Sequence, residues 1–117
     1  MQSDLDKLLD LFDLTDAGDD VFVGRHPEQK TPRTFGGQLL AQGVIAAGQT
    51  ITKGSPPVHA VHAHFIRGGD TSQPLEYHVH RSRDARSFAN RQVTAMQGDS
   101  EIVTMLVAFQ DNTAGLE

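Results

Sequence analysis

Two adjacent glycines, Gly36 and Gly37, stand at the start of a long uncharged stretch and are the first candidates for chemistry. That stretch, GGQLLAQGVIAAGQTIT at residues 36–52, has no charge and no proline, and it predicts a helix enclosed by other structure. The first turn of a helix has unpaired backbone N–H groups at its electropositive end, and glycines let a ligand approach them closely. Gly36, Gly37 and Gln38 therefore predict an oxyanion hole, with a plain tight turn into the helix as the structural alternative.

Histidines form the second candidate group. His62 and His64 share one face of a predicted strand, and His78 and His80 share one face of the next, because residues two apart on a strand point the same way. Four imidazoles on adjacent strands could bind a transition metal. We favour the alternative that they are half-buried sheet positions, so we expect no metal and assign only His62 to the lining of a site.

A third group consists of arginines around a predicted turn: Arg81, Arg83, Arg86 and Arg91. Arginine binds phosphate through two parallel hydrogen bonds, so Arg83 or Arg86 could hold a phosphorylated cofactor tail. An ordinary solvated hairpin end, with arginine paired to Asp84, is the alternative.

The chain has no evident general base. It has no cysteine and no GxSxG motif, and its body has no close pair of carboxylates. An amide such as Gln110 can orient a water molecule by donating and accepting at once, but nothing in the residue pattern alone singles it out.

The elements around these candidates predict an α+β fold. They are a short acidic helix at about 3–14, a strand at 21–26, the helix at 36–52, and four strands at 58–67, 75–83, 88–97 and 101–110. Short connections between the four strands favour an antiparallel meander. A sheet that wraps around one long central helix is a hotdog fold. Gly43 and Gly48 each cost about 1 kcal/mol inside that helix, so we expect close packing against the sheet at both.

Length and charge limit the remaining possibilities. The 117 residues fit one domain, 1–117, and the net charge is −5. Residues 1–20 contain seven acids and one base, which leaves the body near neutral and disfavours nucleic-acid binding. No membrane-length apolar run or secretory signal is visible, so we expect a cytoplasmic protein that binds no membrane. Exposed sheet edges predict a homodimer, a larger assembly or a second hotdog domain as partner.

Four segments, in order along the chain, resemble the N-terminal half of type II acyl-CoA thioesterases. They are FGGQLLAQ (35–42), VHAVHAHFIRGGD (58–70), RSRDARSF (81–88) with Arg91, and AFQ (108–110). Members of this family hydrolyse fatty acyl-CoA and carry two hotdog domains in one chain. The resemblance implies that amides at Gly36 and Gly37 face the thioester carbonyl, with Phe35 and Gln38 beside it.

The resemblance also exposes a departure from the family. There, an Asp, Thr and Gln set on the C-terminal hotdog activates the water. Here Ala60 stands near the Asp position and His80 or Ser82 near the Thr position, so only Gln110 matches.

The resemblance thus implies a thioesterase-type domain that hydrolyses, or helps to hydrolyse, fatty acyl-CoA to fatty acid and CoA. Gly36, Gly37, Gln38 and Gln110 take the catalytic positions, while Phe35, His62, Arg83 and Arg86 contact substrate, the arginines at the CoA phosphates. No cofactor is expected beyond the CoA of the substrate. A non-catalytic acyl-CoA-binding or assembly domain is the alternative, and activity of this chain by itself stays open.

Overall fold

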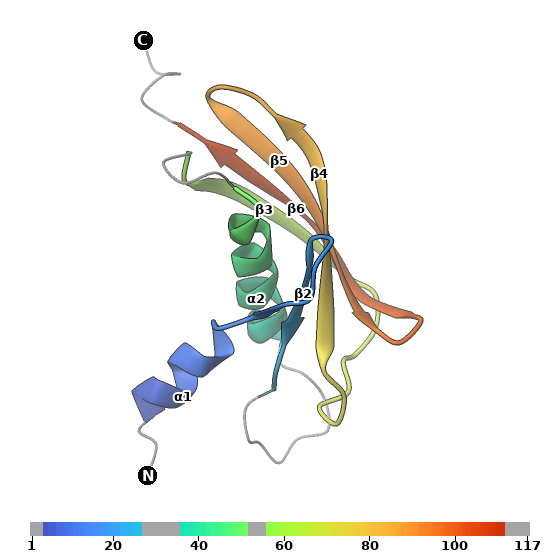
Figure 1. Cartoon of the computed structure of the whole chain (residues 1–117). Helices are drawn as coiled ribbons and strands as arrows, with labels where there is room; N and C mark the ends of the chain where they lie inside the picture. Colours follow the sequence, from blue (N-terminus) through green and yellow to red (C-terminus); the bar gives the residue numbers. More distant parts are fainter. Residues whose placement is uncertain (1–3, 27–35, 52–55, 112–117) are drawn as a thin grey trace.

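The computed structural model describes residues 4–26, 36–51 and 56–111, which contain two helices and six strands. In chain order these are α1 (Asp4–Leu11), β1 (Thr15–Asp16), β2 (Val21–Gly24), α2 (Gly36–Gln49), β3 (Val58–Phe65), β4 (Leu75–Asp84), β5 (Phe88–Gln97) and β6 (Ser100–Gln110) (Figure 1). The predicted helices and strands are all present. β1 is an addition, since it lies where the sequence predicts only a loop.

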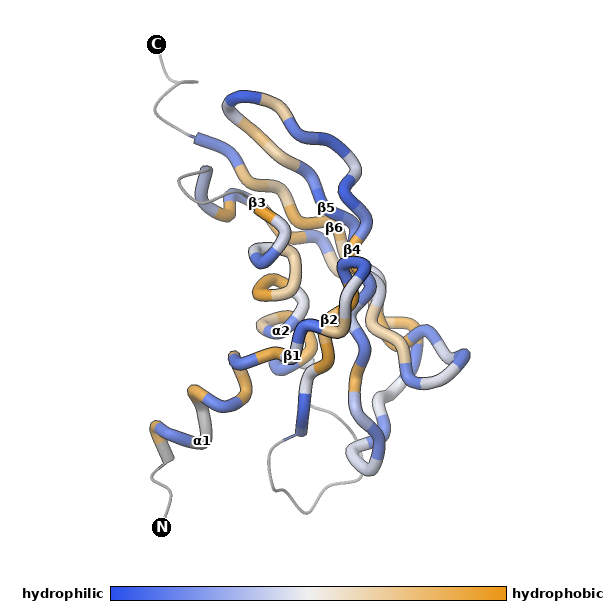
Figure 2. Tube along the Cα trace, in the orientation of Figure 1, coloured by the Kyte–Doolittle hydropathy of each residue, from blue (hydrophilic) through white to orange (hydrophobic). Residues whose placement is uncertain are grey.

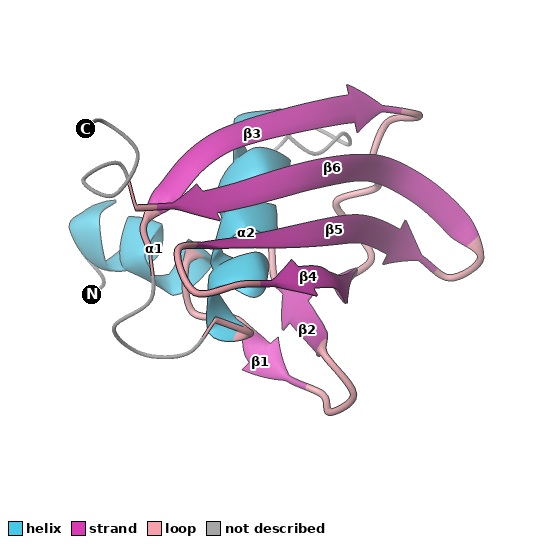
Figure 3. Ribbon diagram, turned by 90° about the horizontal axis from the view of Figure 1, so that it is seen from above, coloured by secondary structure: helices cyan, strands magenta, loops and turns pink. Residues whose placement is uncertain are grey.

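The strands form one antiparallel sheet in the order β1-β2-β4-β5-β6-β3. Seen from above, the long strands arch over α2, which lies against one face of the sheet (Figure 3). The helix packs on β2, β4, β5 and β6. This confirms the predicted α+β arrangement, in which an antiparallel sheet wraps around one long helix.

The position of β3 corrects the predicted meander. β4, β5 and β6 follow one another as antiparallel neighbours, but β3 pairs with β6 and not with β4. The connection at 66–74 therefore crosses the sheet. It can do so because neighbouring strands are only about 4.8 Å apart, whereas an extended chain covers about 3.3 Å per residue. A short connection thus does not require that the two strands pair.

The hydrophobic core lies between α2 and the concave face of the sheet, where Ala46, Ala47 and Val93 have no exposed surface. Figure 2 shows hydrophobic residues along α2 and on the strands beside it. Gly43 confirms the expected close packing, because a Cβ there would overlap the side chain of Met105 on β6. Gly48 does not: it is exposed, with nothing within 4 Å of where its Cβ would be, so that expectation is wrong.

Hydrophobic side chains also remain exposed at two places. On the sheet edge formed by β3, Val58, Val61 and Phe65 are 41–48% exposed. On α1, which projects from the body in Figure 1, Leu5 is 63% and Leu9 53% exposed. Within the described residues, both surfaces lack a covering element.

Candidate active site

The start of α2 lies beside the edge strand β3. Gly36 and Gly37 are the first two helical residues; Gly36 is half-buried and Gly37 exposed. A Cβ on Gly36 would lie 3.5 Å from the ring of Phe65, itself 48% exposed. This places the first-turn backbone amides next to an aromatic ring on the sheet edge. Phe35, predicted to flank the site, lies outside the described residues.

Gln38 follows the glycines and is 7% exposed. Its Nε2 donates to the carbonyl oxygen of Arg25 at 3.3 Å and lies 3.4 Å from Nδ1 of His26. The side chain is thus held against the segment that follows β2. His26 is a site residue that the sequence analysis missed, because no helix or strand periodicity connects it to a glutamine twelve positions away.

Gln42, one turn further along α2, anchors the same part of the helix. It is fully buried, and its Nε2 donates to the carbonyls of Leu11 at 3.0 Å and Arg25 at 3.1 Å. The Tyr77 hydroxyl donates to its Oε1 at 2.7 Å, and burial raises the pKa of that hydroxyl, which keeps it a donor. Gly24 allows this approach, since a Cβ there would lie 2.5 Å from Gln42 Oε1. The first half of α2 is therefore fixed to β2 and β4.

The connection between β3 and β4 completes this end of the site. Asp70 accepts hydrogen bonds from Ser72 N at 2.9 Å and Ser72 Oγ at 2.7 Å, and these bonds lower the pKa of Asp70. Gln97 Nε2 donates to the carbonyls of Asp70 and Gln73 at 2.7 and 3.1 Å. The Gln73 carbonyl in turn lies 2.7 Å from Nε2 of His26. A chain of polar contacts thus runs from β5 through this loop to the start of α2.

His62 lies on the other face of the sheet. It pairs with Leu106, and the neighbouring Met105 packs on α2, so the alternation of a strand directs Leu106 and His62 away from the helix. An open hollow of about 250 Å³ there is lined by His62, His64, Gln92, Thr104, Met105 and Leu106. Within this chain, His62 therefore does not share a surface with Gly37.

Gln110 lies near the opposite end of the sheet. Gly36 sits by Phe65, which pairs with Val103, whereas Gln110 is the last residue of β6 and pairs with Phe88. The strand from Val103 to Gln110 is about 23 Å long at roughly 3.3 Å per residue. The one residue that matches the expected water-positioning set is therefore far from the glycines of its own chain.

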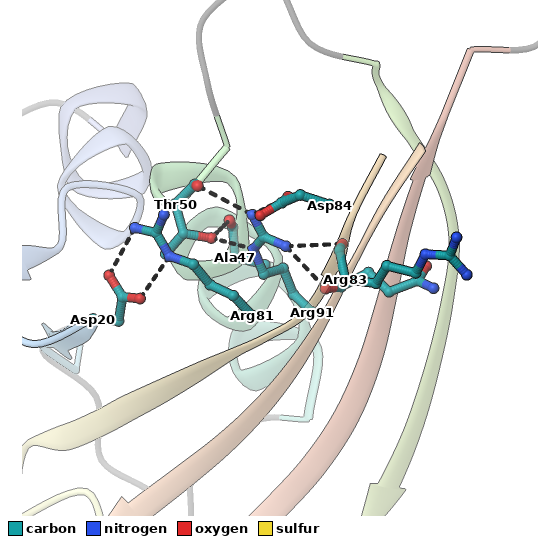
Figure 4. A network of polar contacts seen from close by, with 8 residues as sticks. Asp20, Ala47, Thr50, Arg81, Arg83, Asp84 and Arg91 are labelled. Atoms are coloured by element: carbon teal, nitrogen blue, oxygen red, sulfur yellow. Dashed lines mark hydrogen bonds and ion pairs between the residues drawn. The ribbon is translucent and has the colours of Figure 1, made fainter. Parts of the chain in front are cut away.

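Three of the arginines, Arg81, Arg83 and Arg91, lie near the C-terminal end of α2 (Figure 4). Arg91 is 1% exposed and binds the end of the helix, with Nε donating to Thr50 Oγ1 at 2.6 Å. Arg81 pairs with Asp20 at 2.8 Å, and this hydrogen bond lowers the pKa of Asp20. Two of the four thus serve the structure.

Arg83 and Arg86, the two predicted to meet phosphates, are exposed at the same end of the sheet. Arg83 stacks on the ring of Phe88, with its guanidinium carbon 5.2 Å from the ring centre. Both therefore lie at the end of the sheet opposite to the glycines at the start of α2.

The strand order corrects the prediction that the two pairs of histidines lie on adjacent strands. β5 and β6 separate the pair on β3, His62 and His64, from the pair on β4, His78 and His80. Among the described residues, no group of three or more His, Cys, Asp or Glu side chains could hold a metal ion. His78 instead contacts Glu76 at 3.2 Å.

No helix within 4–26, 36–51 or 56–111 is both long and apolar enough to cross a membrane.

Comparison with known proteins agrees with this arrangement. The model of a family described as the acyl-CoA thioesterase N-terminal domain matches residues 23–110. Human acyl-coenzyme A thioesterase 8 is 37% identical over 92 residues, which are 79% of this chain and 28% of that protein. Acyl-CoA thioesterase 2 of Haemophilus influenzae is 32% identical over all of this chain and 41% of its own length. The chain thus spans less than half the length of these relatives.

Solved structures show the same fold. A TesB protein of Mycobacterium avium subspecies paratuberculosis superposes with a TM-score of 0.82 and 31% identity, over 92% of this chain and 43% of that one. A hot dog fold protein of Alicyclobacillus acidocaldarius, 21% identical, matches with a TM-score of 0.74 over 86% of this chain and 38% of its own. The curled sheet with its enclosed helix is therefore a hotdog fold.

Proposed function

Because this chain belongs to the family of acyl-CoA thioesterase N-terminal domains, we propose that it takes part in the hydrolysis of fatty acyl-CoA to fatty acid and CoA. The observation that carries the proposal is the start of α2, where Gly36 and Gly37 lie beside an exposed aromatic ring. Human acyl-coenzyme A thioesterase 8, whose name states this activity, supports it.

In the reaction, a water oxygen bonds to the thioester carbonyl carbon while a base takes one water proton. The carbonyl oxygen becomes an oxyanion, the carbon–sulfur bond then breaks, and the CoA thiolate receives the proton. We assign the stabilisation of the oxyanion to the backbone N–H groups of Gly36 and Gly37, and one such donor contributes about 10²–10³-fold in rate. The first turn of α2 can stabilise the oxyanion, but its residues Gly36, Gly37 and Gln38 include no group that could act as the base.

We propose that the base comes from a second hotdog unit. Ala60 cannot accept a proton, and Gln110 lies at the far end of β6. Strand β3 is the surface we propose for that unit, because it is a sheet edge with apolar side chains exposed at Val61 and Phe65. A second copy or a homologous hotdog domain paired there would bring its own strand residues toward Gly37.

Three further assignments remain part of this proposal. Arg83 or Arg86 meets the CoA phosphates across such an assembly. The reaction needs water and no cofactor. We place it in the cytoplasm, although the name of a yeast relative that is 34% identical states that it is peroxisomal.

Release of CoA thiol from medium- and long-chain acyl-CoA tests the proposal. We expect Gly37→Leu to lower kcat about 10²-fold by blocking the amides, whereas Gly48→Ala, exposed on the same helix, keeps it. Binding of acyl-CoA without turnover would favour the non-catalytic assembly domain. If the chain neither binds nor hydrolyses acyl-CoA, a thioesterase role for it is refuted.

A further inference from the structure

His26 occupies a defined position between two anchored groups at the start of α2. It follows β2 and Arg25, and it is half-buried. Its Nε2 lies 2.7 Å from the Gln73 carbonyl, and its Nδ1 lies 3.4 Å from Gln38 Nε2. The Gln73 carbonyl is itself held by Gln97, so the ring has a fixed partner on that side.

Hydrogen-bond chemistry determines the form of the ring. A carbonyl oxygen only accepts, so Nε2 of His26 carries a proton toward Gln73. In the neutral imidazole, Nδ1 then accepts from the NH₂ group of Gln38. The same NH₂ group donates to the Arg25 carbonyl at 3.3 Å, so both neighbours of this amide nitrogen are acceptors.

Protonated His26 is incompatible with that arrangement. Both ring nitrogens would then donate, and Nδ1–H would face the NH₂ group of Gln38. The amide would have to rotate to turn Oε1 toward the ring, which removes its hydrogen bond to Arg25. The protonation state of His26 thus sets the direction of the Gln38 amide.

We propose that neutral His26 is a positioning residue that fixes the Gln38 amide in the catalytically competent direction, an inference that rests on the proposed function. In that direction, Oε1 accepts no hydrogen bond from the described residues and is the end of the amide that can accept from a water or substrate. Rotation would withdraw this acceptor from the first turn of α2. Hydrolysis should therefore fall as His26 takes up a proton.

Within residues 4–26, 36–51 and 56–111, Asp70 and Arg25 are charged neighbours of His26 in space or in the chain. Asp70, on the connection between β3 and β4, interacts electrostatically with it. Arg25 precedes it in the chain, and α2 carries no charged side chain. The titration of His26 must therefore be measured together with that of Asp70.

NMR of the isotope-labelled 117-residue chain tests the amide directly, without substrate. We expect the Nε2–H tautomer at neutral pH, and Gln38 side-chain amide signals that shift with the same midpoint as the His26 ring. Gln38→Glu identifies those signals by their loss. An Nδ1–H tautomer, or an amide insensitive to His26 protonation, overturns the inference even if the chain hydrolyses acyl-CoA.

The pH profile of kcat/KM tests the consequence for hydrolysis. His26→Asn keeps an acceptor but cannot titrate, so we expect the acid limb at the His26 midpoint to disappear while kcat at neutral pH is retained within about threefold. His26→Phe should lower kcat about three- to tenfold, with little change in KM. His78→Asn, at an exposed position of β4, serves as control and should match the wild type throughout.

The outcomes separate the two proposals. If the wild type does not turn over acyl-CoA, the proposed function fails, and the NMR titration still decides whether His26 controls Gln38. If turnover is present but His26→Asn keeps the wild-type acid limb, the positioning role is wrong. Thermal unfolding of each variant shows whether a loss of activity reflects a loss of fold.

Discussion

The two ends of α2 are built in opposite ways. At the C-terminal end, the buried guanidinium of Arg91 donates to Thr50 Oγ1 at 2.6 Å and to the Thr50 carbonyl at 3.2 Å, and Thr50 Oγ1 donates to the Ala47 carbonyl at 2.7 Å (Figure 4). At the N-terminal end, no side chain from the described residues accepts from the backbone amides of Gly36 and Gly37. Polar contacts there hold side chains from the third helical position, Gln38, onward.

Under the proposed function, the two ends of this helix have different roles. A helix end that is only structural is stabilised when its orphan groups find partners, as Thr50 and Arg91 provide. An end that must bind a developing negative charge keeps its amides for the ligand and is fixed in place from the side instead. Gln42 and Gln38 supply that lateral anchoring at Arg25.

The largest effect on stability is expected at the C-terminal end of α2. Arg91→Ala should lower the free energy of unfolding by about 3 kcal/mol, because it opens a cavity and removes the donor to the Thr50 carbonyl at the helix end. Urea unfolding with an unchanged m-value measures this. Arg83→Ala, which loses only an exposed contact with Phe88, should cost under about 1 kcal/mol. Equal losses in the two variants would contradict a specific role for Arg91 at the helix end.

A second test concerns what anchors the N-terminal half. Tyr77→Phe removes the donor to Gln42 Oε1 and should cost about 1–3 kcal/mol, since a buried acceptor is left unsatisfied. A double-mutant cycle with Gln42→Met isolates the coupling between the two side chains. If the two losses are additive, Tyr77 stabilises the chain by packing alone.

Glycines along the same helix give the third test. Gly43→Ala should destabilise by about 1–3 kcal/mol, because its Cβ would overlap Met105. Gly48→Ala should stabilise by about 0.5–1 kcal/mol, because its site is open and alanine has the better helix propensity. Thermal unfolding of both variants compares them directly, and a shift of the same sign in both would contradict the packing difference.

Local patterns accounted for most of the fold but not for the sheet order. The uncharged run predicted α2, and alternation predicted the long strands. Pairing of β3 with β6 is determined by tertiary structure, since the sequence of β3 is compatible with an edge position beside either β4 or β6. The same limit applies to the histidines, whose separation by two strands follows only from that order.

The residues of the candidate site likewise divide into those with a local sequence signal and those without one. Gly36 and Gly37 are predictable as site candidates because a glycine pair before an uncharged run carries a local signal, whereas His26 and the Asp70 loop reach α2 only through the fold. Arg91 does carry a local signal. It alternates with Ala89 and Val93, both inward-facing, so the period of a strand already directs its guanidinium into the core.

The smallest effect separates two arginine–aspartate pairs near the C-terminal end of α2, namely Arg81 with Asp20 and the buried Arg91 with Asp84. Hydrogen bonding from Arg81 lowers the pKa of Asp20 below its ordinary 3.8, so the carboxylate is favoured in the folded state. Its contribution is therefore fully present above about pH 4 and is lost as the pH falls through the lower folded-state value. Since Arg81 is 51% exposed and Asp20 30%, that contribution should stay under about 1 kcal/mol and shrink in salt. In urea unfolding, the free energy of unfolding of Asp20→Asn should match that of the wild type in acid and fall slightly below it near neutral pH. The loss of stability in Arg91→Ala should persist in high salt, because the hydrogen bond from Arg91 to the Thr50 carbonyl is buried. A stability difference for Asp20→Asn that grows as the pH falls below 4 would reverse the sign of this linkage and contradict the pairing with Arg81.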